Sequence, residues 1–161
     1  MATIGAIRDR IAELLTAATP SVLGLDRFVE FRNEGDASFL DWCESSAASA
    51  FRRFQVRHDG DFARVNVSNG DVEGLTETFT ISICYPHDYR AGAQQAISRD
   101  KLIDADWHQF NRVCGLYGRG NFFGDHNATV TSQPAPQRLT GASCDFLVIQ
   151  QQMYFYRTQT L

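Results

Sequence analysis

The stretch that decides the fold is residues 75–117, LTETFTISICYPHDYRAGAQQAISRDKLIDADWHQFNRVCGLY. In its first part, successive residues alternate between two faces. Polar Thr and Ser point to one side, and the other side carries Glu77, Phe79, Ile81, Ile83 and Tyr85. A period of two with many β-branched residues is typical of a half-buried strand. The pattern predicts a strand over 76–85.

The second part of this stretch repeats with a helical period. Residues at spacings of four, three, four and three form one stripe: Ile103, Trp107, Phe110, Cys114 and Tyr117. This spacing predicts an amphipathic helix over 102–116, capped by Asp100 or Asp104. We expect the polar residues Asp104, Asp106, His108 and Arg112 to face solvent. The strand and the helix should share one core made of Phe79, Ile81, Ile83, Trp107 and Phe110.

Further elements extend this unit on both sides. Thr3 is a suitable cap for a helix over 3–18, and a short helix is expected within 36–50. Alternation predicts further strands near 26–32, 51–57, 62–68 and 144–157. We expect residues 58–61 to turn the second of these into the third, with a hairpin turn at Asn69-Gly70 and a loop at 72–75. The region 118–143 is expected to be irregular, and Ala128–Thr131 is the only part of residues 127–137 with a possible core periodicity.

These elements predict an α+β fold, in which an N-terminal helix and a second long helix pack on a mainly antiparallel sheet. A chain of 161 residues can bury ~70% of its unfolded surface in one core. We therefore expect one domain over residues 1–161, with a long irregular segment at about 118–143. Irregular segments of that length are usually functional or disordered.

Composition narrows the classes of function. The chain has 43% hydrophobic residues and a formal charge of −4, so we expect no basic surface for sequence-specific nucleic-acid binding. No apolar run approaches the ~20 residues of a membrane-spanning helix, and no membrane partner is expected. Four widely spaced cysteines are expected to be buried free thiols: Cys43, Cys84, Cys114 and Cys144.

No constellation of residues predicts catalysis. The chain has no G-x-S-x-G nucleophile motif and no G-K-[ST] phosphate loop. Asp104 with His108, or Asp125 with His126, could be imagined as metal ligands, but the histidines lack ligand spacing. We therefore predict no catalytic, cofactor or metal site.

Two groups of residues are instead candidates for a subunit interface. Arg52, Arg53 and Arg57 cluster on one predicted strand, and arginine is enriched at interfaces. A solvated strand face explains the same cluster. Phe122 and Phe123 are adjacent rings in the irregular segment, and they are expected to be covered by another subunit or by the chain's own core.

The order of elements resembles that of the tail terminator, or tail completion, proteins of long-tailed bacteriophages. The resemblance lies in an N-terminal amphipathic helix, antiparallel strands that end in residues 76–83, TETFTISI, a helix, and a long C-terminal strand. It covers most of the chain. It implies a virion structural protein and no enzyme, made in the host cytoplasm and located at the head–tail junction. The implied assembly is a homohexameric ring on the tail tube that contacts the head–tail connector, and the genome would pass through it.

Two alternatives stay open. Another head–tail joining or neck protein would share the same assembly chemistry. A small α+β enzyme or ligand-binding domain would need convergent polar groups, for which the region of His87, Asp88 and His126 is the candidate.

Overall fold

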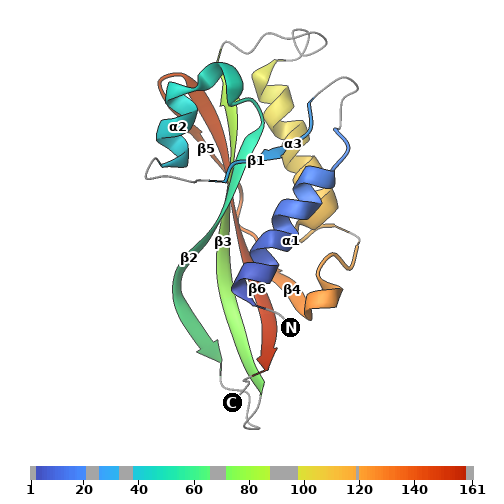
Figure 1. The fold of residues 1–161 in the computed structure, drawn as a ribbon. Coiled ribbons are helices and arrows are strands. Elements are labelled where there is room, and N and C mark those ends of the chain that lie inside the picture. Colours follow the sequence, from blue (N-terminus) through green and yellow to red (C-terminus); the bar gives the residue numbers. More distant parts are fainter. Residues whose placement is uncertain are drawn as a thin grey trace.

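A computed structural model describes residues 3–20, 26–32, 38–65, 72–87, 98–118 and 120–158. The fold is α+β with a mainly antiparallel sheet, as predicted (Figure 1). The helices and strands follow in the order α1 (Ile4–Ala17), β1 (Val29–Glu30), α2 (Phe39–Ser45), β2 (Arg53–Val65), β3 (Val72–Pro86), α3 (Arg99–Cys114), β4 (Ala128–Ser132), β5 (Gln137–Thr140) and β6 (Cys144–Thr158). Single 3-10 turns lie at Ala47–Ser49 and Gly124–His126.

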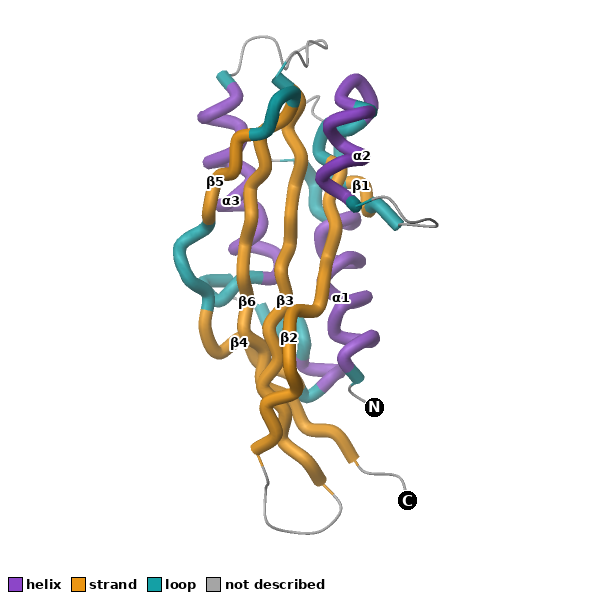
Figure 2. The backbone as a smooth tube through the Cα atoms, turned by 90° about the vertical axis from the view of Figure 1, so that its left-hand side faces the viewer, coloured by secondary structure: helices purple, strands orange, loops and turns teal. Residues whose placement is uncertain are grey.

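The sheet is built around β3, which pairs with β6 along its whole length. The strand order is β1-β2-β3-β6-β4, and β5 also pairs with β6. All neighbours are antiparallel except β1 and β2. The register places Ile81 of β3 between Val56 of β2 and Ile149 of β6, so their side chains share one face. Figure 2 shows β4 and β5 one above the other beside β6.

The predicted alternation of β3 is confirmed. Glu77, Phe79, Ile81, Ile83 and Tyr85 are all at most 1% exposed. One hydrophobic cluster contains residues of the sheet, Ile7 and Ile11 of α1, and Phe110 of α3. Trp107 is partly buried at the margin of this cluster. The predicted core residues therefore lie together.

The two long helices begin at hydroxyl caps. The Thr3 Oγ1 accepts from the Ala6 amide at 3.0 Å, as expected for the first helix. The cap of α3 is Ser98, whose Oγ accepts from the Lys101 amide at 3.4 Å. The prediction of Asp100 or Asp104 as cap was wrong, because the helix begins earlier and Asp100 lies in its first turn.

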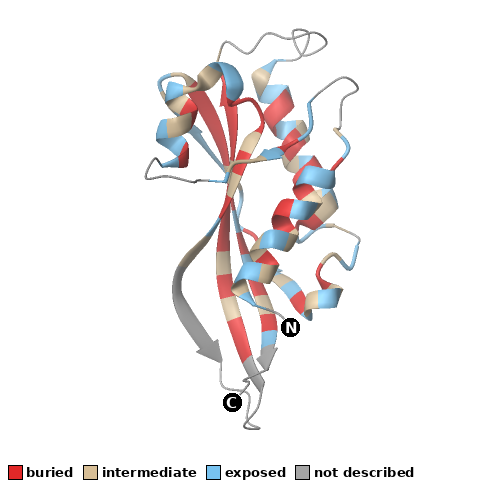
Figure 3. Cartoon of the chain, viewed as in Figure 1, coloured by how far each residue is buried: buried red, intermediate tan, exposed pale blue. Residues whose placement is uncertain are grey.

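Among the described residues, the opposite face of the sheet is covered at one end only. There α2 packs over a second hydrophobic cluster made of Phe39, Cys43, Ala50, Cys84, Cys144 and Phe146. Figures 1 and 3 show α2 at this end, while β2, β3 and β6 continue past the helices at the other end. The short helix expected within 36–50 is thus present.

The expected turn at 58–61 was wrong, because β2 runs through these residues as one strand. Its register with β3 shifts between Asp59, opposite Thr78, and Ala63, opposite Thr76. A bulge of this kind accommodates extra residues without ending the strand. The expected loop at 72–75 is also strand, since β3 begins at Val72. The Asn69-Gly70 turn lies outside the described residues.

Two other segments also differ from expectation. The strand predicted at 26–32 is reduced to Val29–Glu30, which pairs with the start of β2. The segment 118–143, expected to be irregular, contains β4 and β5. Both strands bond to the outer edge of β6, and that pairing, formed by residues distant in sequence, stabilises strands that lack a strong local pattern.

Candidate functional site

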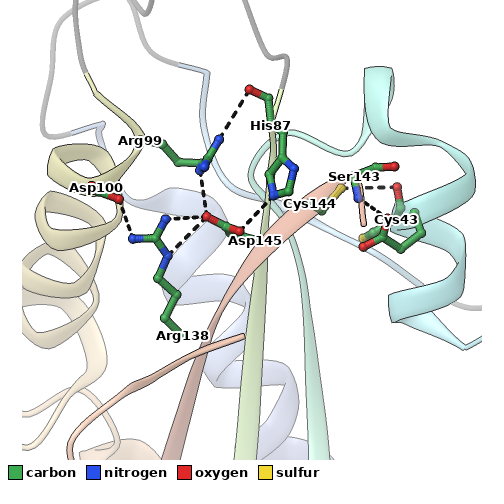
Figure 4. Close-up of polar contacts among 9 residues, drawn as sticks. Cys43, His87, Arg99, Asp100, Arg138, Ser143, Cys144 and Asp145 are labelled. Atoms are coloured by element: carbon green, nitrogen blue, oxygen red, sulfur yellow. Dashed lines mark hydrogen bonds and ion pairs between the residues drawn. The ribbon is translucent and has the colours of Figure 1, made fainter. Parts of the chain in front are cut away.

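The densest group of polar contacts surrounds Asp145, at the start of β6. Its carboxylate accepts from His87 Nε2 at 2.9 Å, from Arg99 Nε at 2.7 Å, and from Arg138 Nη2 at 2.5 Å (Figure 4). Arg138 also pairs with Asp100. We call these five residues the Asp145 cluster. They come from the residue after β3, the start of β6, the first turn of α3, and β5, so the cluster joins four elements at one end of the sheet.

Asp145 is an ionised carboxylate at any physiological pH. Burial alone raises its pKa, but hydrogen bonds from Arg138 and His87, with the charges of Arg138 and Arg99, lower the pKa to about 2. A carboxylate with so low a pKa is a weak general base near neutrality. Both of its oxygens already accept hydrogen bonds. The arrangement is therefore a structural ion-pair network that links neighbouring elements. The side chains of Arg99 and Arg138 remain 36% and 39% exposed.

The polar residues suggested for a small-molecule site do not converge. His87 lies beside Asp145, at the beginning of β6. His126 lies two residues before β4, whose Ala128 pairs with Phe155 near the other end of β6. At ~3.3 Å per residue, the intervening strand separates the two positions by roughly 30 Å. Asp88 lies outside the described residues.

Arg52, a candidate for the interface, is instead sealed in the core. Its side chain is 0% exposed and forms a two-pronged ion pair with Asp106, with Nε to Oδ2 at 3.0 Å and Nη2 to Oδ1 at 2.7 Å. Tyr85 donates its hydroxyl to Asp106 at 2.8 Å, and the guanidinium lies 4.0 Å from the centre of the Phe28 ring. Arg52 therefore has no surface to offer a neighbouring subunit.

Asp106 was expected to face solvent, and this was wrong, since it is 0% exposed. Burial raises the pKa of Asp106, and Arg52 and Tyr85 offset part of that rise. A signal for its position was present in the sequence. Asp106 follows Ile103 by three residues and precedes Phe110 by four, so it lies on the buried stripe of α3. The other three polar residues, Asp104, His108 and Arg112, are exposed as expected.

The remaining two arginine candidates lie at the start and middle of β2. Arg53 is half-buried and donates to the Ser49 carbonyl at 3.4 Å. Arg57 is 68% exposed, and it pairs with Asp59 on the same strand at 2.8 Å. Only Arg57 of the three arginines therefore presents a largely exposed guanidinium.

The two adjacent phenylalanines have different environments. Phe123 is 3% exposed and belongs to the main hydrophobic cluster. Phe122 is half-buried, and its ring lies against the backbone of Gly118 and Gly120, where an added Cβ would come within 2.4 and 2.5 Å of ring carbons. Phe123 is thus covered by its own chain, whereas Phe122 keeps a partly open face.

All four cysteines are buried free thiols, as predicted. Three of them meet under α2 in the second hydrophobic cluster, namely Cys43, Cys84 and Cys144. Cys144 Sγ donates to the Cys43 carbonyl at 3.5 Å. The pKa of Cys84 is raised mainly by a hydrogen bond with Cys43 and, second, by burial. Burial raises the pKa of Cys114. The four thiols therefore act as buried packing groups.

Within the described part of the chain, no group of three or more His, Cys, Asp or Glu side chains could hold a metal ion. Asp104 and His108 approach to 3.8 Å, and both are more than 70% exposed. No helix among the described residues is long and apolar enough to cross a membrane. No family model matches the chain, and no curated protein is significantly similar to it.

Proposed function

We propose that this protein is a virion structural protein, a tail terminator subunit that forms a ring at the head-proximal end of a phage tail. One observation carries the proposal: among the described strands, the sheet is open at both of its lateral edges. A subunit with two open edges can be joined to a copy of itself on each side.

The first open edge is formed by β4 and β5. Both strands pair with β6 on one side, and within the described ranges no strand lies on the other side of either. All four residues of β5 are exposed, including Leu139 at 45%.

The second open edge is the outer side of β2. There β1 covers only Arg53 and Phe54, and the Arg8 Nε donates to the Val56 carbonyl at 3.2 Å. From Arg57 to the end of β2, no described strand lies on this side.

Unpaired strand edges favour association with other chains, because their amide and carbonyl groups lack partners. Contact between two different edges of identical subunits is heterologous, and such contacts close into rings when the rotation between neighbours permits. An α+β subunit with two helices packed on one sheet is the architecture that the tail terminator resemblance implies. The proposed partners are copies of this chain, in a ring that is a hexamer, together with the tail tube protein and the head–tail connector.

Mass photometry and analytical ultracentrifugation of the purified full chain test the proposal. We expect one closed species of defined stoichiometry, and we expect that species to bind the ends of purified tail tubes in electron micrographs. A protein that stays monomeric at all concentrations, with and without tail tubes, would overturn the proposal. Binding to purified head connectors but never to tails would instead favour a different neck protein.

A further inference from the structure

At the end of the sheet that α2 covers, the two lateral edges are formed by β5 and β1. β5 lies beside β6 on one side, β1 lies beside β2 on the other, and within the described ranges no further strand lies beyond either. Figure 2 shows both strands near the same end of the sheet, on opposite sides of it. Two such edges can join neighbouring copies when they match in height, in strand direction and in the orientation of their backbone groups.

The two edges match in height, because one row of paired residues crosses the whole sheet. The row passes through β1, β2, β3, β6 and β5, and its members are Glu30, Phe54, Ile83, Leu147 and Arg138. A second copy placed beside β5 in the same orientation, with this row continued, brings its Glu30 opposite Arg138 of the first copy.

The two edges also match in direction. β1 runs parallel to β2, whereas the pairings of β2 with β3, of β3 with β6, and of β6 with β5 are all antiparallel. β5 therefore runs opposite to β1. Two copies in the same orientation present antiparallel strands to each other, which is the arrangement that already dominates this sheet.

The backbone groups at both edges are oriented for direct hydrogen bonds. The Gly141 amide donates to a carbonyl of β6 at 2.8 Å, so Gly141 faces β6, and alternation along β5 turns Arg138 away from β6. On the other edge, the amides of Val29 and Phe31 donate to carbonyls of the β2 side at 3.2 and 2.7 Å, so Glu30 between them faces away. Two outward residues placed opposite each other form the antiparallel pair that exchanges both amide–carbonyl bonds.

An exposed apolar side chain lies next to each of these outward residues, on the same face of the sheet. Leu139 pairs with Phe146, which packs under α2. Val29 pairs with the residue before Phe54, and Phe54 faces the main cluster, so Val29 faces the α2 side. Leu139 is 45% exposed and Val29 is 40% exposed. Continuing the row places these two side chains directly opposite each other, in the closer, non-hydrogen-bonded type of pair.

We propose that β5 of one copy pairs antiparallel with β1 of the next copy, and that this pairing continues the sheet across the boundary between subunits. The inference rests on the proposed ring and identifies the strands that join its subunits. Arg138 exchanges backbone hydrogen bonds with Glu30 of the next copy, and Leu139 packs against Val29 of that copy. The charged side chains of Arg138 and Glu30 keep the ion pairs that they form within their own chain.

A cross-link tests the register of this pairing. Opposed residues in a non-hydrogen-bonded pair have Cα atoms about 4.5 Å apart, which a disulfide can span. A chain with Val29→Cys and Leu139→Cys, treated with oxidised glutathione, should give a ladder of covalent multimers on non-reducing gels. The matched control, Val29→Cys with Gln137→Cys, moves one thiol by two residues on the same face and should give less than a tenth of that cross-linking. The native cysteines are buried and are present in both variants.

A proline tests the backbone bonds. Thr140 faces away from β6, as Arg138 does, so Thr140→Pro removes an outward amide and leaves the pairing with β6 intact. This variant should need at least a tenfold higher concentration than the wild type for half-maximal assembly. Thr140→Val keeps the amide and should assemble like the wild type, and circular dichroism should show both variants folded.

The outcomes separate this contact from the ring itself. Rings of the Val29→Cys, Leu139→Cys variant that give no ladder would overturn the contact and leave the ring proposal standing. Equal cross-linking in the Gln137→Cys control would overturn the register, and assembly of Thr140→Pro at the wild-type concentration would overturn the backbone pairing. A wild type that never assembles overturns the ring proposal, and the contact with it.

Discussion

Two arginine–aspartate sites in this protein use the same chemical groups in opposite surroundings. At Arg52–Asp106 both side chains are 0% exposed, and the pair lies between α3 and the sheet. At Asp145 the carboxylate is 1% exposed, but Arg99 and Arg138 are more than a third exposed. Burial raises the pKa of Asp106, whereas the arginines and His87 lower the pKa of Asp145 to about 2 despite its burial.

This difference shows what a buried charge needs. In a fully buried ion pair, each charged group depends on its partner, because no water can replace a partner that is lost. The cost of desolvating both charges can also exceed the attraction between them. At the Asp145 cluster, solvent reaches the cations, and three donors share one acceptor, so each single contact is less critical. We therefore expect Asp106→Ala, which breaks the Arg52–Asp106 pair, to be strongly destabilising. The Asp145 cluster should tolerate the loss of one of the donors to Asp145.

The largest effect should come from breaking the sealed pair. Asp106→Ala leaves the Arg52 guanidinium buried without its carboxylate, and the free energy of unfolding should fall by about 3–5 kcal/mol. Urea denaturation measures this loss. The double variant Arg52→Met with Asp106→Leu should lose less than Asp106→Ala, because it removes both charges. A single variant within 1 kcal/mol of wild type would show that the pair is dispensable.

The next largest effect should come from Asp145→Asn, which removes the negative charge that Arg99, Arg138 and His87 contact. Lowering the carboxyl pKa from about 3.9 to about 2 corresponds to roughly 2–3 kcal/mol of stability at neutral pH. Thermal or urea unfolding at pH 7 measures it. The isosteric amide keeps the packing, so the loss reports mainly on the charge.

The pH dependence sharpens the contrast. Because the pKa of Asp145 is lower in the folded state, its contribution is complete above pH ~5 and disappears as pH falls from about 4 through about 2. The stability difference between wild type and Asp145→Asn should therefore shrink over that interval. A difference that stays constant from pH 7 to pH 2.5 would mean that the amide disturbs packing instead.

A smaller effect is expected from the exposed side of the same cluster. Arg138→Gln leaves Arg99 and His87 on Asp145, and the remaining donors and water compensate, so we expect a loss below about 1 kcal/mol. The same urea titration at low salt measures it. A loss as large as that of Asp106→Ala would show that the Asp145 cluster depends on each contact as strongly as the fully buried Arg52–Asp106 pair does.

The smallest effect should be that of Arg57→Gln, which removes an exposed pair with Asp59 on β2. Exposed pairs typically contribute 0.2–1 kcal/mol, and salt screens them. We expect a change of a few tenths of a kcal/mol that disappears at about 1 M salt. A change that persists in high salt would show that the arginine stem contributes packing.

Local pattern determined much of the secondary structure. The alternation of 76–85 and the helical spacing around Phe110 placed β3 and α3, and the hydroxyl of Thr3 marked the start of α1. These features depend on residues within one or two turns or a few strand positions, so the sequence contains them directly. The prediction of buried thiols followed in the same way from residue type.

Tertiary pairing decided the remainder. Arg52 and Asp106 are 54 residues apart, and Arg99 meets Asp145 across 46 residues. Local sequence periodicity does not identify such a distant partner. Asp106 was predicted to face solvent because it is charged, although its position lies on the buried stripe of α3. Likewise β4 and β5 are strands because β6 is long enough to bond both, and β2 continues through 58–61 because β3 pairs on each side of its bulge. The sequence determined which residues could face inward, and the pairing of distant segments decided which charges were enclosed together.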